Sequence, residues 1–281
     1  MHIGIGLPIG DPTALIDWAR RADAGPFSTL GLLDRLVYDN PEPLVALAVL
    51  AGATSRIRVQ TEVLLAPLRD TALLAKQAAT VDRMTDGRLV LGLGIGGRHD
   101  DHRATDVDIR TRGRRLDEQM RVLRRLWAGE PHGQGVGPIG PLPARPGGPE
   151  VLFGGFKPVA LERVARWGDG FLAAAPPSWA GGLFDTVRRF WHEYGREGEP
   201  RIVAQINVAL GPEELIDEAR AAMRAYYAFT GMADRMAAGM LTTRVEIRDA
   251  ITGFADLGAD EVMLYCYGLD PAQVDRLADV L

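Results

Sequence analysis

The sequence has few of the features that mark several common classes of protein. Its 281 residues include one cysteine, Cys266, which excludes an internal disulfide and favours a reducing compartment. The longest uninterrupted run of apolar residues and glycine, 44–53, is far shorter than the roughly 20 residues that a membrane helix needs. No basic segment with a long apolar core precedes the first apolar strand, so no secretory signal is expected. These absences predict a cytoplasmic protein with no membrane partner.

Positive charge is also scarce. The 32 Lys and Arg residues are outnumbered by 37 Asp and Glu residues, which gives a formal net charge of −5. A protein whose main partner is nucleic acid or an anionic membrane surface generally carries an excess of basic residues, so neither partner is expected. Hydrophobic residues make up 47% of the chain and charged residues 25%, a balance typical of a globular protein with a sizeable core.

Apolar strands and amphipathic helices alternate along the first hundred residues. Strand starts recur about every 30 residues, which is the length of one strand–helix–strand step. Asp11 and Pro12 are expected to begin the first helix, because proline is favoured at a first helical position. The expected strands are 3–7, 29–33, 57–65 and 89–93, and the helices that follow the first are 43–53 and 71–84.

The second half repeats this alternation less evenly and completes the fold prediction. Eight strands separated by helices, without long hairpins, favour parallel pairing with both faces of the sheet covered. A (β/α)8 TIM barrel, formed as one domain over residues 1–281, is the simplest such arrangement, and a doubly wound open sheet is the main alternative. The remaining predicted strands are 151–153, 170–173, 202–210 and 261–265; the helices are 114–127, 159–167, 184–194, 213–227, 244–257 and 271–280; and 129–149 is a long irregular connection rich in glycine and proline.

The segment GRLVLGLGIGG, residues 87–97, is the most informative part of the sequence. A buried strand runs directly into a loop of glycines, which lets the backbone approach a flat or anionic ligand closely. Gly92, Gly94 and Gly97 satisfy the dinucleotide pattern G-x-G-x-x-G, but that pattern requires a helix to begin at its last glycine. Here the loop continues into Arg98 and His99, so the match is weak, and a tight turn without a ligand is an equally acceptable interpretation.

A second glycine turn follows the predicted strand 151–153. Gly154 and Gly155 expose successive backbone N–H groups, and Lys157 adds a positive charge just before Pro158, which suits a first helical turn. This arrangement could hold a phosphate group. A plain strand-to-helix turn with a solvated lysine is the favoured interpretation of these residues taken alone.

The residues resemble a known family across roughly their first 175 positions. The segments DRLVYDNPEPLVALA, TSRIRVQTEVLLAP and LLAKQAATVDRMTDGRLVLGLGIGG are similar to those of bacterial luciferase-like flavin oxidoreductases, and so are TRGRRLDEQMRVLRRLW and VLFGGFKPVALERVARWGDGF. That family includes FMN-dependent monooxygenases and oxidoreductases that use the deazaflavin F420. Its fold is a (β/α)8 barrel, in agreement with the strand count.

The resemblance implies roles for particular residues. The flavin ring of the family lies over the strand-end loops, against a non-proline cis peptide bond after the third strand. In this chain that bond is expected between Glu62 and Val63, directly after Thr61. The other cofactor-binding residues implied are Gly94, Ile95 and Gly96 at the ring or ribityl chain, and Gly154, Gly155, Phe156 and Lys157 at the phosphate. Arg112 is a further cofactor-binding candidate from its position beside the glycine loop, although the arginines of 110–125 are more typical of a solvated helix face.

The chain departs from the family pattern at three places. Many members have an acid–histidine pair after the second strand, whereas this chain has Asp34 and Arg35. Arginine does not exchange a proton near neutral pH, but it can stabilise an anionic flavin or substrate, so both residues are catalytic candidates. Bacterial luciferase has a phosphate-binding arginine where Ile95 stands, and relatives often have a Gly-Thr-Pro turn where this chain has residues 240–243.

Two further groups of residues leave alternatives open. His99 begins the fourth strand-end loop and is a third catalytic candidate, while His99 and His102 together could suggest a metal site. A mobile surface loop is the favoured interpretation, and no metal is expected. Tyr226, Tyr227 and Phe229 form an aromatic stripe that is either core or part of a lid over 226–243.

The sequence therefore predicts a flavin- or F420-dependent oxidoreductase. The favoured form is a monooxygenase in which reduced FMN, supplied by a separate flavin reductase, and O2 oxidise a small organic substrate. F420-dependent hydride transfer is the alternative, and a non-catalytic flavin-binding or partner subunit is the second alternative. A barrel lyase or isomerase that uses Glu62 or Lys157 remains if no flavin binds. A homodimer formed through helices 43–53 and 71–84 is expected from the resemblance.

Overall fold

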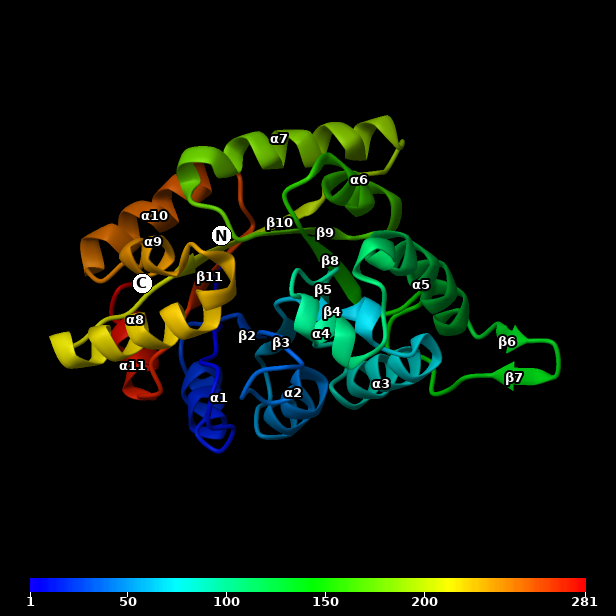
Figure 1. Cartoon of the computed structure of the whole chain (residues 1–281), viewed down its shortest axis with the longest axis horizontal. Coiled ribbons are helices and arrows are strands. Elements are labelled where there is room, and N and C mark those ends of the chain that lie inside the picture. Colours follow the sequence, from blue (N-terminus) through cyan, green and yellow to red (C-terminus); the bar gives the residue numbers. More distant parts are fainter.

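The strands of this protein are short and almost wholly apolar, because both faces of each are covered. The computed structural model describes all 281 residues, and its main sheet is a closed barrel of eight parallel strands surrounded by helices (Figure 1). Pairing of β3 with β5 closes the ring, so the TIM barrel is confirmed and the open sheet is excluded. Around the ring the strands are β1 (His2–Gly6), β2 (Thr29–Leu32), β3 (Arg58–Thr61), β5 (Leu89–Gly94), β8 (Glu150–Gly154), β9 (Gly170–Ala173), β10 (Arg201–Asn207) and β11 (Glu261–Tyr265).

The third barrel strand is interrupted near its end. The peptide bond between Glu62 and Val63 is cis, as the resemblance implies, and the short strand β4 (Leu64–Leu65) continues along β5 beyond it. The expected single strand 57–65 is therefore wrong in detail, because β3 ends at Thr61 and two residues separate it from β4.

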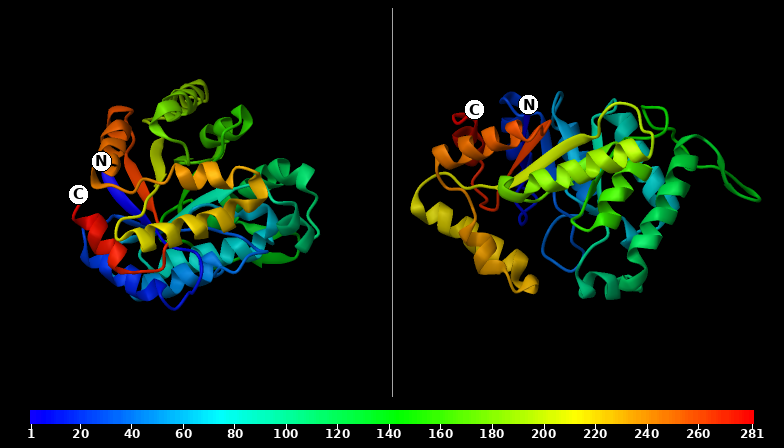
Figure 2. Two further views of the ribbon diagram at one scale, coloured as in Figure 1. Left: turned by 60° about the vertical axis from the view of Figure 1, so that its left-hand side comes forward. Right: turned by 90° about the horizontal axis from the view of Figure 1, so that it is seen from above.

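The helices lie around the barrel, and most of them bury one apolar face against it. β1 and β11 are neighbours in the ring, and the two chain ends lie on the same side of the molecule (Figure 2). No helix is long and apolar enough to cross a membrane. The helices are α1 (Leu15–Ala24), α2 (Pro43–Gly52), α3 (Thr71–Met84), α4 (His99–Ala104), α5 (Arg112–Trp127), α6 (Pro158–Trp167), α7 (Pro177–Glu193), α8 (Glu213–Tyr227), α9 (Ala233–Ala238), α10 (Arg244–Asp256) and α11 (Ala272–Ala278).

Inside the barrel, large side chains are accommodated by glycines on neighbouring strands. A Cβ atom at Gly6 would lie 2.1 Å from the ring of Tyr265, and one at Gly31 would lie 2.6 Å from the carboxyl carbon of Glu62. The middle of the interior is a small apolar cluster of Val90, Leu152, Leu172, Val203 and Met263. The barrel is thus a filled core rather than a channel.

The end of the barrel where the strands begin is closed by charged side chains. Arg58 and Arg201 both pair with Glu150, and Arg201 also pairs with Glu261, which in turn accepts a hydrogen bond from Ser28. The Arg201–Glu150 pair has an N–O distance of 2.9 Å. A hollow of about 470 Å³ opens at this end, and none of its lining side chains is hydrophobic.

Several expected boundaries are wrong for identifiable reasons. The first helix begins at Leu15 rather than at Pro12, because 12–14 form a turn in which Asp11 accepts bonds from Thr13. Helix α7 begins at Pro177 rather than at 184, since Gly181 and Gly182 weaken the helical pattern of its first half without ending it.

Two segments expected to be irregular have regular structure. Residues 129–149 contain an antiparallel hairpin of β6 (Pro131–Gly133) and β7 (Val136–Pro138), which projects from the body of the molecule (Figure 1). The segment after the glycine loop, expected to be a mobile surface loop, is helix α4, in which Asp101 and His102 are buried. Contacts with the rest of the barrel end, described below, account for this helix.

Candidate active site

A cavity of about 240 Å³ lies where the barrel strands end. Its walls come from the loops after β2, β3, β5 and β8, from the ends of β9 and β10, and from the aromatic end of α8. This is the face at which barrel enzymes carry out their chemistry. The lining residues are Leu33, Asp34, Arg35, Glu62, Val63, Leu65, Gly96, Gly97, Arg98, Asp101, Gly154, Gly155, Phe156, Leu172, Ala174, Gln205, Tyr226, Tyr227 and Phe229.

The structure brings together more than half of the residues expected at the site. Asp34, Arg35, Glu62, Val63, Gly96, Gly154, Gly155 and Phe156 all line the cavity. Six expected residues lie outside this lining: Thr61, Gly94, Ile95, His99, Arg112 and Lys157. Sequence reasoning missed Arg98, Asp101 and Gln205, and it left the aromatic residues of 226–229 undecided between core and lid.

The floor of the cavity is built around Val63. A Cβ atom at Gly94 would lie 2.4 Å from one methyl carbon of Val63, and one at Gly154 would lie 3.1 Å from the other. Two glycines expected to approach a cofactor therefore make room for this side chain. Thr61 is engaged in the strand ladder, where its hydroxyl donates to the carbonyl of Gly92 at 2.7 Å.

Glu62 places a carboxyl group inside the barrel directly beneath the cavity. One carboxyl oxygen accepts a hydrogen bond from the side chain of Gln60, and the other has no hydrogen-bond partner. Burial raises the pKa of Glu62 to about 8, and the nearby Glu261 carboxylate contributes to the rise. The carboxyl group therefore holds its proton at neutral pH and is able to donate a hydrogen bond.

Asp34 is occupied by contacts that hold the loop after the third strand. Its carboxylate accepts a hydrogen bond from the backbone N–H of Leu65 at 2.8 Å and pairs with Arg69 at 3.0 Å. Burial raises the pKa of Asp34, and the charge of Arg69 opposes that rise. The geometry gives this residue a positioning role between β2 and β4.

Arg35 and Asp101 form a buried ion pair between the loop after β2 and helix α4. The Nε atom of Arg35 lies 2.9 Å from a carboxylate oxygen of Asp101. The other oxygen accepts from the backbone N–H groups of Leu36 and Val37 at 3.2 and 2.7 Å. Asp101 therefore orders the loop that carries Arg35, which explains why α4 is fixed rather than mobile.

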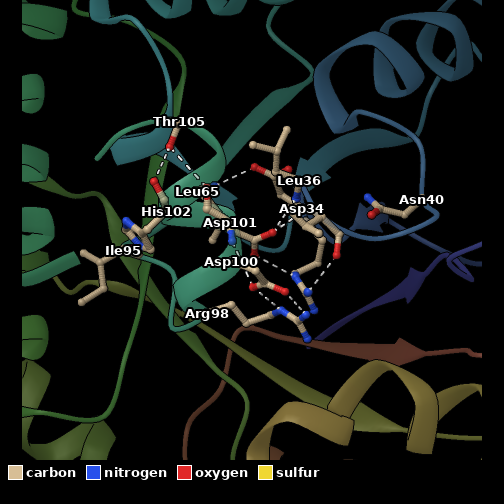
Figure 3. A network of polar contacts seen from close by, with 12 residues as sticks. Asp34, Leu36, Asn40, Leu65, Ile95, Arg98, Asp100, Asp101, His102 and Thr105 are labelled. Carbon is tan, nitrogen blue, oxygen red and sulfur yellow. Dashed lines mark hydrogen bonds and ion pairs between the residues drawn. The ribbon is translucent and has the colours of Figure 1, made fainter. Parts of the chain in front are cut away.

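His102 supports the glycine loop from below. Its Nε2 atom lies 3.2 Å from the carbonyl oxygen of Ile95 (Figure 3) and would be 3.2 Å from a Cβ atom at Gly96. Gly96 has a φ of +70°, a conformation that favours glycine. Burial lowers the pKa of His102, so the neutral imidazole is favoured. His99 is exposed on the outer face of the same helix.

The turn after β8 approaches the start of α6 closely. A Cβ atom at Gly155 would lie 2.6 Å from the Cβ of Ala160, so the turn accommodates glycine alone without a shift. Lys157 is the residue immediately before α6 and is exposed. Phe156 packs on Trp179 with ring centroids 5.5 Å apart, so it forms a rim of the cavity.

The missed residues left little signal in the sequence. Helix α4 has six residues, which is too short for a hydrophobic period to be recognised. Asp100 and Asp101 do fall in its first turn, where acidic residues are favoured, and that is the one local signal available. The contact of Asp101 with Arg35 joins residues 66 positions apart, so it depends on the closed barrel.

The fold and the position of the cavity define a (β/α)8 barrel whose site lies at the carboxyl ends of its strands. The luciferase-like monooxygenase family model matches residues 3–261, and the chain belongs to this family.

Two curated relatives illustrate the range of this similarity. A protein of Mycobacterium tuberculosis described as uncharacterized is 29% identical over 216 residues, covering 66% of this chain and 74% of its own. The F420-dependent glucose-6-phosphate dehydrogenase of Kineococcus radiotolerans is 24% identical over 268 residues, covering 83% of this chain and 79% of its own.

Solved structures at lower identity share the fold over the whole chain. The monooxygenase RslO1 from Streptomyces bottropensis has a TM-score of 0.78 at 20% identity, covering 100% of this chain and 97% of its own. An F420-dependent secondary alcohol dehydrogenase in complex with an F420-acetone adduct has a TM-score of 0.82 at 18%, with 100% and 98% covered. The oxygenating constituent of 3,6-diketocamphane monooxygenase from Pseudomonas putida, in complex with FMN, has a TM-score of 0.77 at 15%, with 100% and 96% covered.

Proposed function

We propose that this protein is a monooxygenase that uses reduced FMN and O2 to oxidise a small organic substrate. Membership of the luciferase-like family supports an oxidoreductase, and the FMN-bound neighbour supports the cofactor by analogy. The observation that carries the choice of subtype is the residue at the end of β2. Arg35 stands where many family members have a histidine: it does not exchange a proton near neutral pH, but it can stabilise an anionic flavin, and no histidine lines the cavity.

The residues of the cavity fit a flavin. Gly96 and Gly97 on one wall and Gly154 and Gly155 on another present backbone without side chains, which suits a planar ring and its chain. Gly155 lies so close to Ala160 that no side chain fits there, and the turn before α6 therefore presents bare backbone at this position. Lys157 and the N-terminus of this ten-residue helix add positive charge for a phosphate group.

Reduced FMN, when bound, supplies two electrons for the insertion of one oxygen atom of O2 into the substrate, while the other oxygen leaves as water. The protein's own residues position the ring and stabilise charge. Val63 supports the ring from the floor, and Arg35 places a permanent positive charge at the wall. The protonated carboxyl of Glu62 offers a hydrogen-bond donor beneath.

The two carboxylates around the cavity differ in their bearing on hydride transfer. Both oxygens of Asp101 are engaged, by Arg35 and by two backbone N–H groups. Asp34 accepts from Arg69 and from the Leu65 N–H through Oδ2 alone, so its Oδ1 could serve as the base that alcohol oxidation needs. F420-dependent hydride transfer is the second candidate function, because the F420-dependent dehydrogenase of Kineococcus radiotolerans aligns over 83% of this chain.

Titration of the protein separates these functions. FMN, reduced FMN under anaerobic conditions, and F420 are added in turn while absorbance and fluorescence are followed. We expect reduced FMN to bind most tightly and the loaded protein to consume O2 when a substrate is present. A tight response to F420 with none to reduced FMN would replace the proposal by hydride transfer. Binding of flavin without turnover of any substrate would indicate a non-catalytic subunit.

The same proposal extends to the partners and the domain organisation. Residues 1–281 are treated as one barrel domain, with 226–243 as a lid over the cavity and a separate flavin reductase as the source of reduced FMN. Helix α2 supports a homodimer: it is apolar on all sides, and Val45 and Val49 on its outer face are 62% and 54% exposed. Leu73 at the start of α3 continues this apolar surface.

A further inference from the structure

The guanidinium group of Arg35 has one N–H edge that the protein leaves unused. Nε donates to Asp101, and Nη2 donates to the carbonyl of Val37 at 3.4 Å. Nη1 is buried and has no hydrogen-bond partner. The side chain is 5% exposed and lines the cavity. A buried donor without an acceptor is costly, so such an atom in a cavity wall points to a ligand.

A second guanidinium stands beside the first. The Cζ atoms of Arg35 and Arg98 lie 5.3 and 4.7 Å from the centre of the same Phe229 ring. Arg98 is paired with Asp100, which also accepts from the backbone N–H of Asp101. Two guanidinium groups therefore lie against the Phe229 ring at one wall of the cavity, each paired with one carboxylate.

Aromatic rings surround this pair of charges. The Cζ atom of Arg35 is 5.3 Å from the ring centres of Tyr38, Tyr226 and Phe229. Tyr226 and Tyr227 pack edge to face with centroids 4.9 Å apart, and both line the cavity. These rings exclude water from the guanidinium and offer flat apolar contact, so they favour a planar ligand over a hydrated inorganic ion.

We propose that the substrate is a planar, aromatic carboxylic acid whose carboxylate is bound by Nη1 of Arg35, with Arg98 contributing a second positive charge. This inference rests on the proposed function, because it assigns the substrate of the same cavity. The carboxylate replaces the missing acceptor of Arg35, and the ring of the substrate packs on the aromatic residues of 226–229. Because the carboxylate is held at Arg35, the opposite end of the substrate faces the floor of the cavity.

The test compares acids with their neutral amides. Benzoate and benzamide, and phenylacetate and phenylacetamide, are titrated into the protein by calorimetry, with and without FMN. We expect each acid to bind at least about tenfold more tightly than its amide, the scale of a hydrogen bond to a charged group. Arg35→Met is expected to abolish this preference, and Arg98→Gln to reduce it several-fold.

A matched control and a second variant keep the result interpretable. Arg110→Gln removes an arginine that is exposed and paired with Asp108 outside the cavity, so the preference should be unchanged. Because Arg35→Met leaves Asp101 without its partner, its fold is checked by far-UV circular dichroism. If Arg35→Met is unfolded, Arg98→Gln decides the outcome. The side chain of Arg98 is 18% exposed and that of Arg35 is 5% exposed, so its replacement disturbs the fold less.

The outcomes separate this inference from the proposed function. Equal affinity for acids and amides, no binding of either, or an acid preference that survives both substitutions would overturn the substrate class. If FMN binds in any of those cases, the flavin proposal stands. If the acids bind with the expected preference and no flavin binds, the anion subsite stands and the monooxygenase proposal is wrong.

Discussion

At the scale of single residues, Glu62 is a buried carboxyl group whose pKa differs strongly from that of an exposed glutamate. It faces Gln60 on its own strand, Gly31 on β2, and the side chains of Glu261 and Tyr265 on β11, with Arg201 of β10 close enough to lower its pKa. Burial nevertheless raises that pKa from 4.5 to about 8. A proton is thus retained in the folded protein over a range in which the unfolded chain has lost it.

Replacing Glu62 by Gln should change how stability depends on pH. Between pH 4.5 and 8 the unfolded chain is deprotonated at Glu62 and the folded protein is not. The stabilisation from this group is therefore complete below pH 4.5 and is lost toward pH 8, at about 1.4 kcal/mol per pH unit. In urea unfolding from pH 4 to 9, the free energy of unfolding of Glu62→Gln should therefore increase relative to that of the native protein as the pH rises from 4.5 to 8. Parallel curves for the two proteins would contradict the raised pKa.

Gly155 offers a test of the proposed phosphate site. A valine side chain would strike Ala160 and cover the backbone N–H groups before α6, so we expect FMN affinity to fall at least about tenfold. Quenching of flavin fluorescence measures the loss. Gly182→Ala is the control, because its Cβ atom meets nothing within 4 Å and lies outside the cavity. Unchanged FMN affinity in Gly155→Val would refute the proposed phosphate site at the turn after β8.

The residue scale also shows where sequence reasoning succeeds and where it stops. The Glu62–Val63 cis bond is confirmed. It was predictable because the resemblance places it directly after a strand that the sequence identifies clearly. Gly94 is predicted to contact the cofactor, and that role stays a prediction; the structure shows that Gly94 makes room for the Val63 side chain. A glycine in a sequence shows that space is required, but the neighbour that occupies the space is set by the fold.

At the scale of elements, α2 departs from the pattern of a surface helix. A helix that is apolar on all sides is normally buried on all sides, yet the outer residues Val45 and Val49 are exposed in the single chain. Burial of this face against a second copy would remove apolar surface from water on both chains.

Charged substitutions on α2 should therefore give a monomer. We expect Val45→Lys combined with Val49→Lys to halve the mass measured by analytical ultracentrifugation, since two buried lysines would face their symmetry mates. Val245→Lys on α10 is the matched control, because Val245 is 65% exposed on another helix. A single-chain mass for the native protein would contradict the homodimer outright.

Elements differ in how well the sequence predicts them. Helix α8 and strand β11 have the predicted bounds, because each has a clear hydrophobic period and distinct ends. Helix α4 was missed, since its stability comes from Asp101 and His102 contacts with other segments rather than from its own six residues. Short elements held by tertiary contacts leave no periodic signal.

At the scale of the whole molecule, the barrel divides stability and chemistry between its two ends. The charged network of Arg58, Glu150, Arg201 and Glu261 ties β3, β8, β10 and β11 together where the strands begin. The cavity lies at the opposite end, where the strands finish. Topology was predictable from the alternation of strands and helices, whereas this network required the ring to be closed before its members could meet.

Removing Glu150 should weaken the barrel without changing the site. Glu150→Ala leaves Arg58 without its carboxylate and Arg201 with Glu261 alone, which is expected to lower the free energy of unfolding by about 3 kcal/mol. Urea unfolding measures this loss, and FMN affinity below the transition should be unchanged. A large fall in FMN affinity with full stability would show that the two ends are coupled.

A glycine on the inner wall of the barrel can be invariant because of packing alone, without any contact with a ligand. The Tyr265 ring fills the space beside Gly6, so a substitution of Gly6 collides with this ring whichever ligand the protein binds. At Gly31 the neighbour is the flexible end of the Glu62 side chain, which can move. A survey of tolerated mutations should therefore find Gly6 invariant alongside Gly155. At Gly6 the cause would be the packing of neighbouring strands, whereas at Gly155 it would be the binding of the cofactor. A selection that measures folding separately from activity would distinguish these two causes.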